Sequence, residues 1–466
     1  MYEVAFISLC YLLGAELWWL MAIAIILNRF IKKPLLILMV FSPIFWLFAL
    51  NRNIYTLIHK FFYQNRFSAT DQILFYITGL VICFTIYFIL YNFYKLIDKE
   101  AKHPLPYLIL FWFLLIFINY SLRSPYLTFI PAMGSLIFIF FSNAFFIIAY
   151  ELKNSRRQKN LKIHESFSLL NTMHFNSFLF VSTQLSPKGS QHLVDGVVEN
   201  KKLKNLQLMS IKLLGLCVAV KVLTTFIGHL LLNVENSYWT NLHLPMLSYV
   251  DLMQYQTTPR YFVMNHSASE QNVYFAIIVR SFHWFAERTV GWNSKIAVLW
   301  FLGIYIELGV LNPFKSSSFV DFFRRAHVYV ADFYRVFIYK YLSGFFSFIK
   351  NPNLKKYICI WFMIYIGGFV FQTISHYYTI FSWSFTDYVI AMKARAFYDG
   401  VLATTICVGL FCEKKFPNSS NKIRLLRTFI YIISYSFLMS MSSSLKSPNF
   451  SLNSLFRYFQ ILLGQN

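Results

Sequence analysis

The sequence has few charged residues, and acidic residues are the scarcest of them. Only 13% of its 466 residues are Asp, Glu, Lys or Arg, whereas 57% are hydrophobic. Soluble globular chains carry about 25% charged residues. So little charge argues against an ordinary soluble enzyme and indicates a chain that lies mostly in lipid.

Paired cysteines and nucleotide-binding motifs are also missing. None of the six cysteines forms a CxxC pair, so the sequence indicates neither a zinc site nor a disulfide framework. The absence of a GxxxxGK[S/T] loop argues against an ATP-driven pump. We expect no metal and no permanently bound cofactor. No small-residue cleavage site follows the first apolar stretch, so we expect that stretch to remain as a membrane anchor.

Long apolar runs fill most of the chain instead. A run of about 20 apolar residues crosses the hydrocarbon core as a helix, because a helix satisfies its own backbone hydrogen bonds. The sequence predicts an all-α polytopic membrane protein with about ten or eleven transmembrane helices, plus re-entrant or interfacial helices. The predicted spans are 4–27, 34–50, 72–94, 105–119, 126–150, 206–233, 294–311, 357–380, 384–411 and 427–441, with a weaker one at 271–290.

Basic residues outnumber acidic ones, 42 to 19, and the formal charge is +23. In a soluble protein this excess would suggest nucleic acid as a partner. Here the basic residues follow the first, third and fifth predicted spans, and cytoplasmic loops are enriched in Lys and Arg. This pattern predicts an N-terminus outside the cell and no nucleic-acid partner. It divides the chain into an N-terminal transmembrane bundle (1–150), a cytoplasmic basic segment (151–205) and a C-terminal transmembrane half (206–466).

The stretch 318–341 places many charges within this apolar chain. As one helix it would carry two acid–base pairs at helical spacing, Asp321–Arg325 and Asp332–Arg335, which would lower the cost of holding arginines at membrane depth. One interpretation is an interfacial amphipathic helix. The other is a helix that lines a polar passage inside the protein. The residue pattern leaves both open.

A longer motif surrounds these charges. It consists of Asn312-Pro313-Phe314, Ser318, Asp321-Phe322-Phe323-Arg324-Arg325-Ala326-His327, Arg335 and Tyr339. This motif resembles the membrane-bound O-acyltransferase family, in particular its bacterial branch of alginate and peptidoglycan O-acetylases and the D-alanyl transferase of teichoic acids. The family's second histidine corresponds to His376, which lies 49 residues beyond His327 in an apolar run.

The chain departs from the family pattern at several positions. Phe323 and Ala326 stand where the branch usually has Trp, and Val336 stands where it usually has Asp. Tyr377 follows His376 where the branch has glycine. The resemblance therefore implies a divergent member with an MBOAT-like fold.

The resemblance implies the chemistry as well. The family moves an acyl group from a thioester to an acceptor, here a small acyl group such as acetyl and a hydroxyl of a cell-surface or lipid-linked polysaccharide. The implied catalytic residues are His376 and His327. The implied substrate-binding or supporting residues are Asn312, Asp321, Arg324, Arg325 and Arg335. The implied donor is acyl-CoA or an acyl-carrier-protein thioester, and the other partners are membrane lipid, a glycan and a possible partner envelope protein, at a bacterial inner membrane.

Two other classes of function remain open at this point. A non-enzymatic flippase for lipid-linked glycans would also need buried arginines, although it would more often spread them over several spans. A membrane glycan polymerase would favour a large outer loop with acidic catalytic residues, and 233–272 offers only Glu235, Asp251 and Glu270, without a motif.

Overall fold

The structure is a computed structural model. It describes residues 2–13, 18–38, 40–41, 61–63, 65–97, 103–121, 129–154, 188, 190–232, 286, 289–311, 316, 318–375, 385–415, 426–427, 430–431 and 434.

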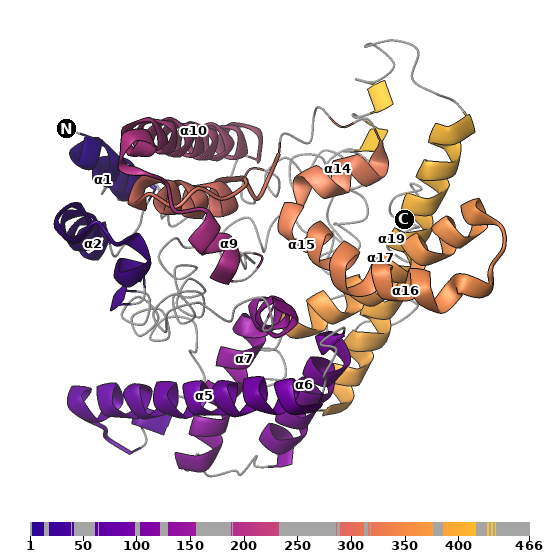
Figure 1. Cartoon of the computed structure of the whole chain (residues 1–466), viewed down its shortest axis with the longest axis horizontal. Helices are drawn as coiled ribbons and strands as arrows, with labels where there is room; N and C mark the ends of the chain where they lie inside the picture. The colour runs from indigo at the N-terminus through magenta and orange to yellow at the C-terminus, as the bar shows by residue number, and fades with distance from the viewer. Residues whose placement is uncertain are drawn as a thin grey trace.

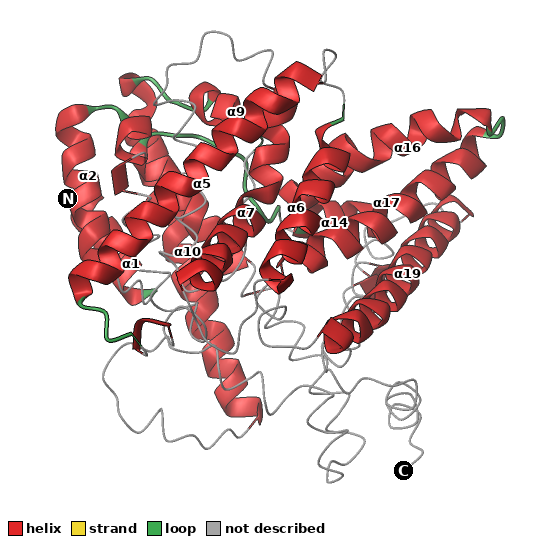
Figure 2. Ribbon diagram, turned by 90° about the horizontal axis from the view of Figure 1, so that it is seen from below, coloured by secondary structure: helices red, strands yellow, loops and turns green. Residues whose placement is uncertain are grey.

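Helices account for the regular structure of these residues (Figure 2). They are α1 (Tyr2–Leu12), α2 (Trp18–Ile31), α5 (Ala69–Ile97), α6 (Pro104–Ser121), α7 (Phe129–Asn154), α9 (Ser190–Asp195), α10 (Asn200–Leu232), α14 (Phe319–Ala326), α15 (Val328–Phe333), η3 (Tyr334–Tyr339), α16 (Lys340–Phe345), η4 (Phe346–Phe348), α17 (Pro352–Ser375) and α19 (Phe385–Lys415). Residues 289–302 form a further helix. The all-α prediction is confirmed for this part of the chain.

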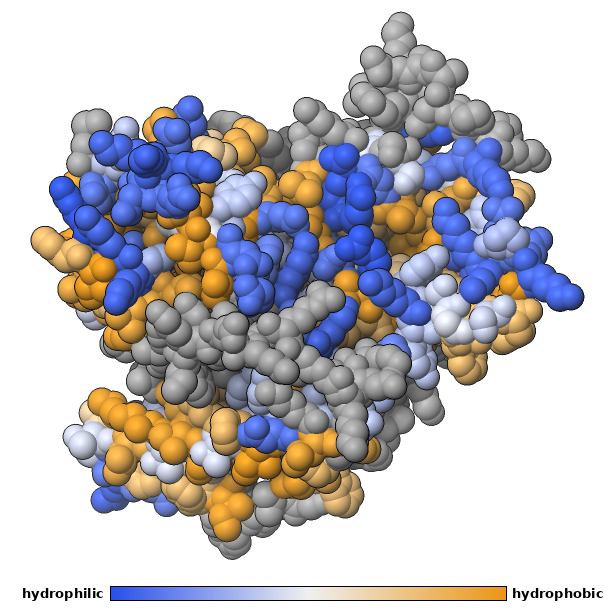
Figure 3. Space-filling model, in the orientation of Figure 1, coloured by the Kyte–Doolittle hydropathy of each residue, from blue (hydrophilic) through white to orange (hydrophobic). Residues whose placement is uncertain are grey.

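Three of the described helices are long and apolar enough to cross a membrane. Their apolar stretches are Ala69–Tyr94, Asn200–Leu223 and Ala396–Lys414, in α5, α10 and α19. Figure 3 shows apolar side chains over the part of the molecule where Figure 1 places α5 and α6. These findings support a membrane protein.

Several predicted spans coincide with observed helices. The spans 72–94, 105–119 and 126–150 correspond to α5, α6 and α7, and the spans 206–233 and 384–411 lie largely within α10 and α19. The span predicted at 357–380 begins earlier, at Pro352, and its last residues lie outside the described ones. Most of 34–50, 271–290 and 427–441 also lies outside them. Since α10 begins at Asn200, the basic residues at 201–204 belong to its first turn and not to a separate loop.

Two predicted spans are wrong in detail. The single span expected at 4–27 is divided, because α1 ends at Leu12 and α2 begins at Trp18. The helix expected to run to 311 ends at 302. The next residue, Gly303, has φ +100°, a left-handed conformation that glycine adopts without the cost of a Cβ.

After Gly303 the chain pairs with the segment between α9 and α10. Val197 and Ile304 form an isolated antiparallel bridge. Two backbone bonds flank it: Val198 N–H donates to the Gly303 carbonyl (2.9 Å), and Tyr305 N–H donates to the Gly196 carbonyl (2.7 Å). This pairing ties the segment that begins at Lys188 to the segment that leads toward α14.

The stretch 318–341 is not the single helix that was predicted. His327, with φ −143° and ψ 61°, separates α14 from α15, and residues 334–339 form a π-helix, η3. The break leaves backbone groups without helical partners, and the neighbouring segment supplies them. Leu311 N–H donates to the Arg325 carbonyl (2.8 Å), and Val328 N–H donates to the Gly309 carbonyl (3.2 Å).

The C-terminal helices pack as one group, coloured orange to yellow in Figure 1. α17 and α19 pack together, with Trp361 Nε1 donating to Thr404 Oγ1 (3.0 Å) and Cys407 Sγ lying 3.7 Å from the Tyr357 carbonyl. These contacts make the two helices antiparallel. α14 lies against α19, and η3 against α17. A buried apolar cluster that includes Phe322, Ile364 and Ala403 joins α14, α17 and α19.

Candidate functional site

A pocket of about 740 Å³ lies where the broken helix meets α17 and α19. This volume is within the usual range for small-molecule sites. The motif residues that line it are Phe323, Arg324, Arg325, His327, Arg335 and Tyr339. On the side of α17 and α19 the lining is mainly aliphatic and includes Ile360, Ile364, Leu402 and Ile406.

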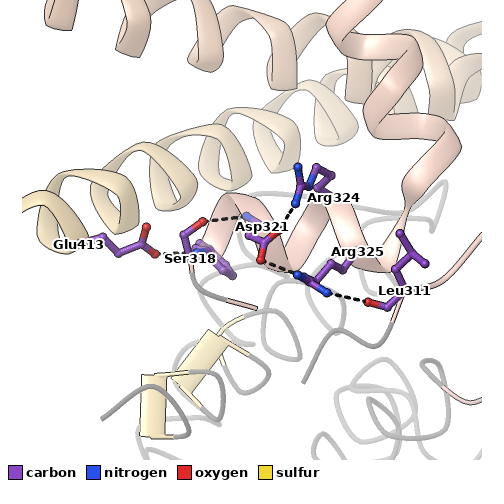
Figure 4. A network of polar contacts seen from close by, with 7 residues as sticks. Leu311, Ser318, Asp321, Arg324, Arg325 and Glu413 are labelled. Carbon is purple, nitrogen blue, oxygen red and sulfur yellow. Dashed lines mark hydrogen bonds and ion pairs between the residues drawn. The ribbon is translucent and has the colours of Figure 1, made fainter. Parts of the chain in front are cut away.

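Asp321 is the centre of the charge network in α14. Its Oδ1 accepts from Arg324 Nη2 (2.6 Å) and its Oδ2 from Arg325 Nε (2.8 Å), and its side chain is only 10% exposed. Arg325 also donates to the Leu311 carbonyl (3.4 Å), as Figure 4 shows. One carboxylate therefore holds two guanidinium groups, and the predicted pair Asp321–Arg325 is confirmed.

The start of α14 has two acceptors for its free backbone N–H groups. Ser318 Oγ accepts from Asp321 N (2.9 Å), an N-cap of the usual kind. Glu413 of α19, which Figure 4 labels, accepts from Phe319 N and from the Tyr431 hydroxyl, both at 2.6 Å. The negative charge of Glu413 at a helix N-terminus is favourable. These bonds hold α14, and with it the arginines, against α19.

A second ion pair lies beyond the break. Asp332 accepts from Arg335 Nη2 (2.6 Å) and from the hydroxyl of Tyr150 on α7 (2.9 Å). The predicted pair Asp332–Arg335 is thus confirmed, and Asp332 also joins α15 to α7. The Arg335 side chain remains 69% exposed. Its guanidinium has N–H groups left over for a ligand.

His327 lies at the break itself and lines the pocket. Its ring is 5.9 Å from the Trp292 ring in an edge-on arrangement, and 6.3 Å from the Phe323 ring, nearly parallel to it. Trp292 lies in the helix at 289–302 and is fully buried. Gly309 can pack directly against it because glycine has no Cβ, and a Cβ there would lie only 2.5 Å from the indole. The break at His327, supported by Gly309 and Leu311, therefore gives this imidazole its position on the pocket wall.

Two consecutive glycines bring α17 close to its neighbours. A Cβ on Gly367 would lie 2.8 Å from the Tyr334 ring, and one on Gly368 would lie 2.6 Å from Asp399 Oδ1. Asp399 is fully buried on α19 and lines the pocket. Ionisable residues within apolar helices are costly and usually functional. Gly368 therefore makes room for a carboxylate beside the pocket.

Replacing Gly368 with alanine is expected to lower the free energy of unfolding by about 1–3 kcal/mol, the usual cost of overpacking. The new methyl group would overlap the Asp399 carboxylate. Gly215 in α10 is the matched control, because a Cβ there meets nothing within 4 Å, and alanine favours a helix interior over glycine. Thermal unfolding of both purified variants in one detergent measures the difference. Equal stability would contradict the close packing of α17 on Asp399.

The pocket lining also includes Lys188 and Glu307, which form an ion pair at 3.0 Å. His192 in α9 lies close to this pair, and its Nε2 is buried with no hydrogen-bond partner among the described residues. Burial, and then the charge of Lys188, lower the pKa of His192; the carboxylates of Glu307, Asp195 and Asp332 oppose this shift. Protonation of this imidazole is therefore less favourable in the folded protein than in the unfolded chain.

A histidine with a lowered pKa makes stability depend on pH. Below its ordinary value of 6.5, the unfolded chain takes up a proton that folded His192 resists. We therefore expect stability to be present above pH 6.5 and to be lost on acidification, by at most about 1.4 kcal/mol per pH unit for this group. The variant His192→Gln should show a shallower fall between about pH 6.5 and 5. Unfolding measured across this range tests it, and equal slopes would refute it.

The structure brings together most of the predicted residues that it describes. Arg324, Arg325, His327 and Arg335 line the pocket, and Asp321 holds two of them. His376 and Asn312 lie outside the described residues, so their placement stays a prediction.

Sequence reasoning did not single out Asp399, Lys188 or Lys356 as pocket residues. Asp399 had one usable signal, a carboxylate within an apolar span. The two lysines had none, because they resemble the other basic residues that mark topology.

Comparison of the chain with protein-family models and with curated proteins found no match. The resemblance to the O-acyltransferases therefore rests on the motif residues and their spacing.

Proposed function

We propose that this chain is a membrane O-acyltransferase. It would move a small acyl group, such as acetyl, from a CoA or acyl-carrier-protein thioester to a hydroxyl of a cell-surface or lipid-linked polysaccharide at a bacterial inner membrane. One observation carries the proposal: the motif residues Arg324, Arg325, His327, Arg335 and Tyr339 line a single pocket of about 740 Å³. Separate positions on a lipid-facing helix would not produce a shared cavity.

Acyl transfer needs a base for the acceptor hydroxyl and hydrogen-bond donors for the oxyanion that forms. The acceptor oxygen attacks the thioester carbonyl carbon, a C–O bond forms, and the C–S bond then breaks. A neutral histidine takes the hydroxyl proton and passes it to the leaving thiolate, so the products are an ester and a thiol. His376 is the expected base and His327 its partner. Arg324 uses one N–H on Asp321, and its 67% exposed side chain has further donors for the developing oxyanion.

A lipid-linked-glycan flippase is the second candidate. The observation in its favour is that the described lining of the pocket includes five cationic residues, Lys188, Arg324, Arg325, Arg335 and Lys356. Such a set also suits the phosphate groups of a transported lipid.

Mass spectrometry of surface glycans from cells with and without the protein distinguishes the two. An acyltransferase predicts loss of one acyl mass from a glycan that is otherwise present in normal amount. Loss of the whole glycan would support the flippase instead. Unchanged glycan mass and amount would refute both.

A further inference from the structure

The two sides of the pocket differ in chemistry. The side formed by α14, α15 and η3 supplies Arg324, Arg325 and Arg335, and Lys188 also belongs to the lining. The side formed by α17 and α19 is mainly apolar, apart from Lys356 in the second turn of α17 and Asp399 on α19. Figure 3 shows hydrophilic side chains gathered over the upper part of this face of the molecule. A ligand that fills the space must be both anionic and apolar.

The charges in the lining are not balanced. Among the described lining residues, five are cationic and three carry carboxylates, Glu307, Asp332 and Asp399. Asp321, outside the lining, adds a fourth carboxylate but is shared by two arginines. One positive charge is left over. Charge-assisted bonds from guanidinium and ammonium groups are the common means of holding a phosphate.

Lys356 is the cation without a described partner. It lies in the second turn of α17 with an exposed side chain, and no carboxylate of a described residue pairs with it. Lys356, Ile360, Ile364 and Gly368 follow each other at four-residue spacing and all line the pocket. At 1.5 Å per residue this stripe is about 18 Å long. It begins with a free ammonium group and continues along aliphatic side chains.

We infer that the pocket binds a lipid phosphate, a phosphate ester of a long aliphatic alcohol, with the phosphate among the cations and the chain along α17 and α19. Binding of such a lipid does not depend on acyl transfer. The role of this lipid site in acyl transfer rests on the proposed function. In that role the glycan acceptor arrives attached to a lipid phosphate carrier, so acylation precedes release of the glycan from its lipid.

The test is equilibrium binding of radiolabelled farnesyl phosphate to the purified full-length protein in detergent. We expect unlabelled farnesyl phosphate to compete, and farnesol, inorganic phosphate and CoA to compete at least ten-fold less well. Lys356→Gln should weaken binding by about ten-fold, the effect of losing one charge-assisted bond. Lys350→Gln is the matched control, because Lys350 is also exposed and basic but lies outside the lining, and its affinity should be unchanged.

Three other outcomes would overturn the inference, and a fourth would overturn only the proposed function. If CoA competes as well as farnesyl phosphate, the pocket belongs to the acyl donor, which leaves the proposed function standing. If inorganic phosphate competes as well as farnesyl phosphate, the apolar side chains of α17 and α19 contribute nothing to the affinity. If Lys356→Gln and Lys350→Gln bind alike, the phosphate lies elsewhere. If the purified protein binds farnesyl phosphate tightly and through Lys356, but the glycans of cells that contain the protein carry no acyl group, the lipid site stands and the acyltransferase proposal is refuted.

Discussion

Replacing His376 with glutamine should lower acyl transfer by about 10²- to 10⁴-fold, the usual contribution of a general base. Glutamine keeps much of the size and hydrogen-bonding capacity of histidine but cannot take the acceptor proton. His376 is assigned as the base because it lies 49 residues beyond His327 within an apolar stretch, where the family resemblance places the second histidine. The measurement is acyl transfer by purified protein, with membrane abundance determined alongside.

His103→Gln is the control for this substitution. His103 is exposed, and its ring lies 5.2 Å from that of Tyr341, away from the pocket lining. Its variant should transfer acyl groups at the normal rate. His327→Gln provides the second comparison: if His327 assists His376, its loss should shift the pH profile of the rate as well as lower it. Wild-type turnover by His376→Gln would disprove the assignment of the base.

Replacing Asp321 with alanine should lower the free energy of unfolding by about 3 kcal/mol, the lower end for breaking a buried ion pair. The side chain of Asp321 is only 10% exposed, and its carboxylate pairs with two guanidinium groups. Asp321 also lies in the first turn of α14, where a negative charge is favourable. Without it, Arg325 is a partly buried cation, and the acceptor that remains for it among the described residues is the carbonyl of Leu311. Unfolding in mixed micelles measures the loss.

A double variant separates charge from packing. Removing both partners of a buried pair is often nearly neutral, so Asp321→Ala combined with Arg325→Met should recover most of the lost stability. Arg324 would keep its charge in water, because its side chain is 67% exposed. If the double variant is no more stable than Asp321→Ala alone, the ion pair is not the cause of the loss.

Some features of the site follow from local sequence alone. Asp321–Arg325 and Asp332–Arg335 are three or four residues apart, and within one turn of helix such residues are neighbours whatever the rest of the chain does. The apolar helices follow from the length and composition of single segments. α5, α6 and α7 therefore lie close to where the sequence predicts them.

Other features depend on segments far apart in the chain. The break at His327 was not predictable from 318–341, because Gly309 and Leu311 supply the backbone partners that stabilise it. The sequence cannot show which of its many helix-length segments will offer such partners. The same holds for the end of the helix before Gly303. The next residue, Ile304, forms a bridge with Val197, which is about a hundred residues earlier in the chain.

Helix formation and ion pairs at helical spacing are local, so the order of residues is enough to predict a helical, apolar chain suited to a membrane, with one short stretch of paired charges. That this stretch lines a pocket, with arginines on one side and mainly apolar side chains of α17 and α19 on the other, depends on how the helices pack. The same packing places Lys188, Lys356 and Asp399 in that pocket. The reason is that a cavity is made by the antiparallel packing of α17 on α19 and by the close approach at Gly368, and neither contact is encoded within any one segment.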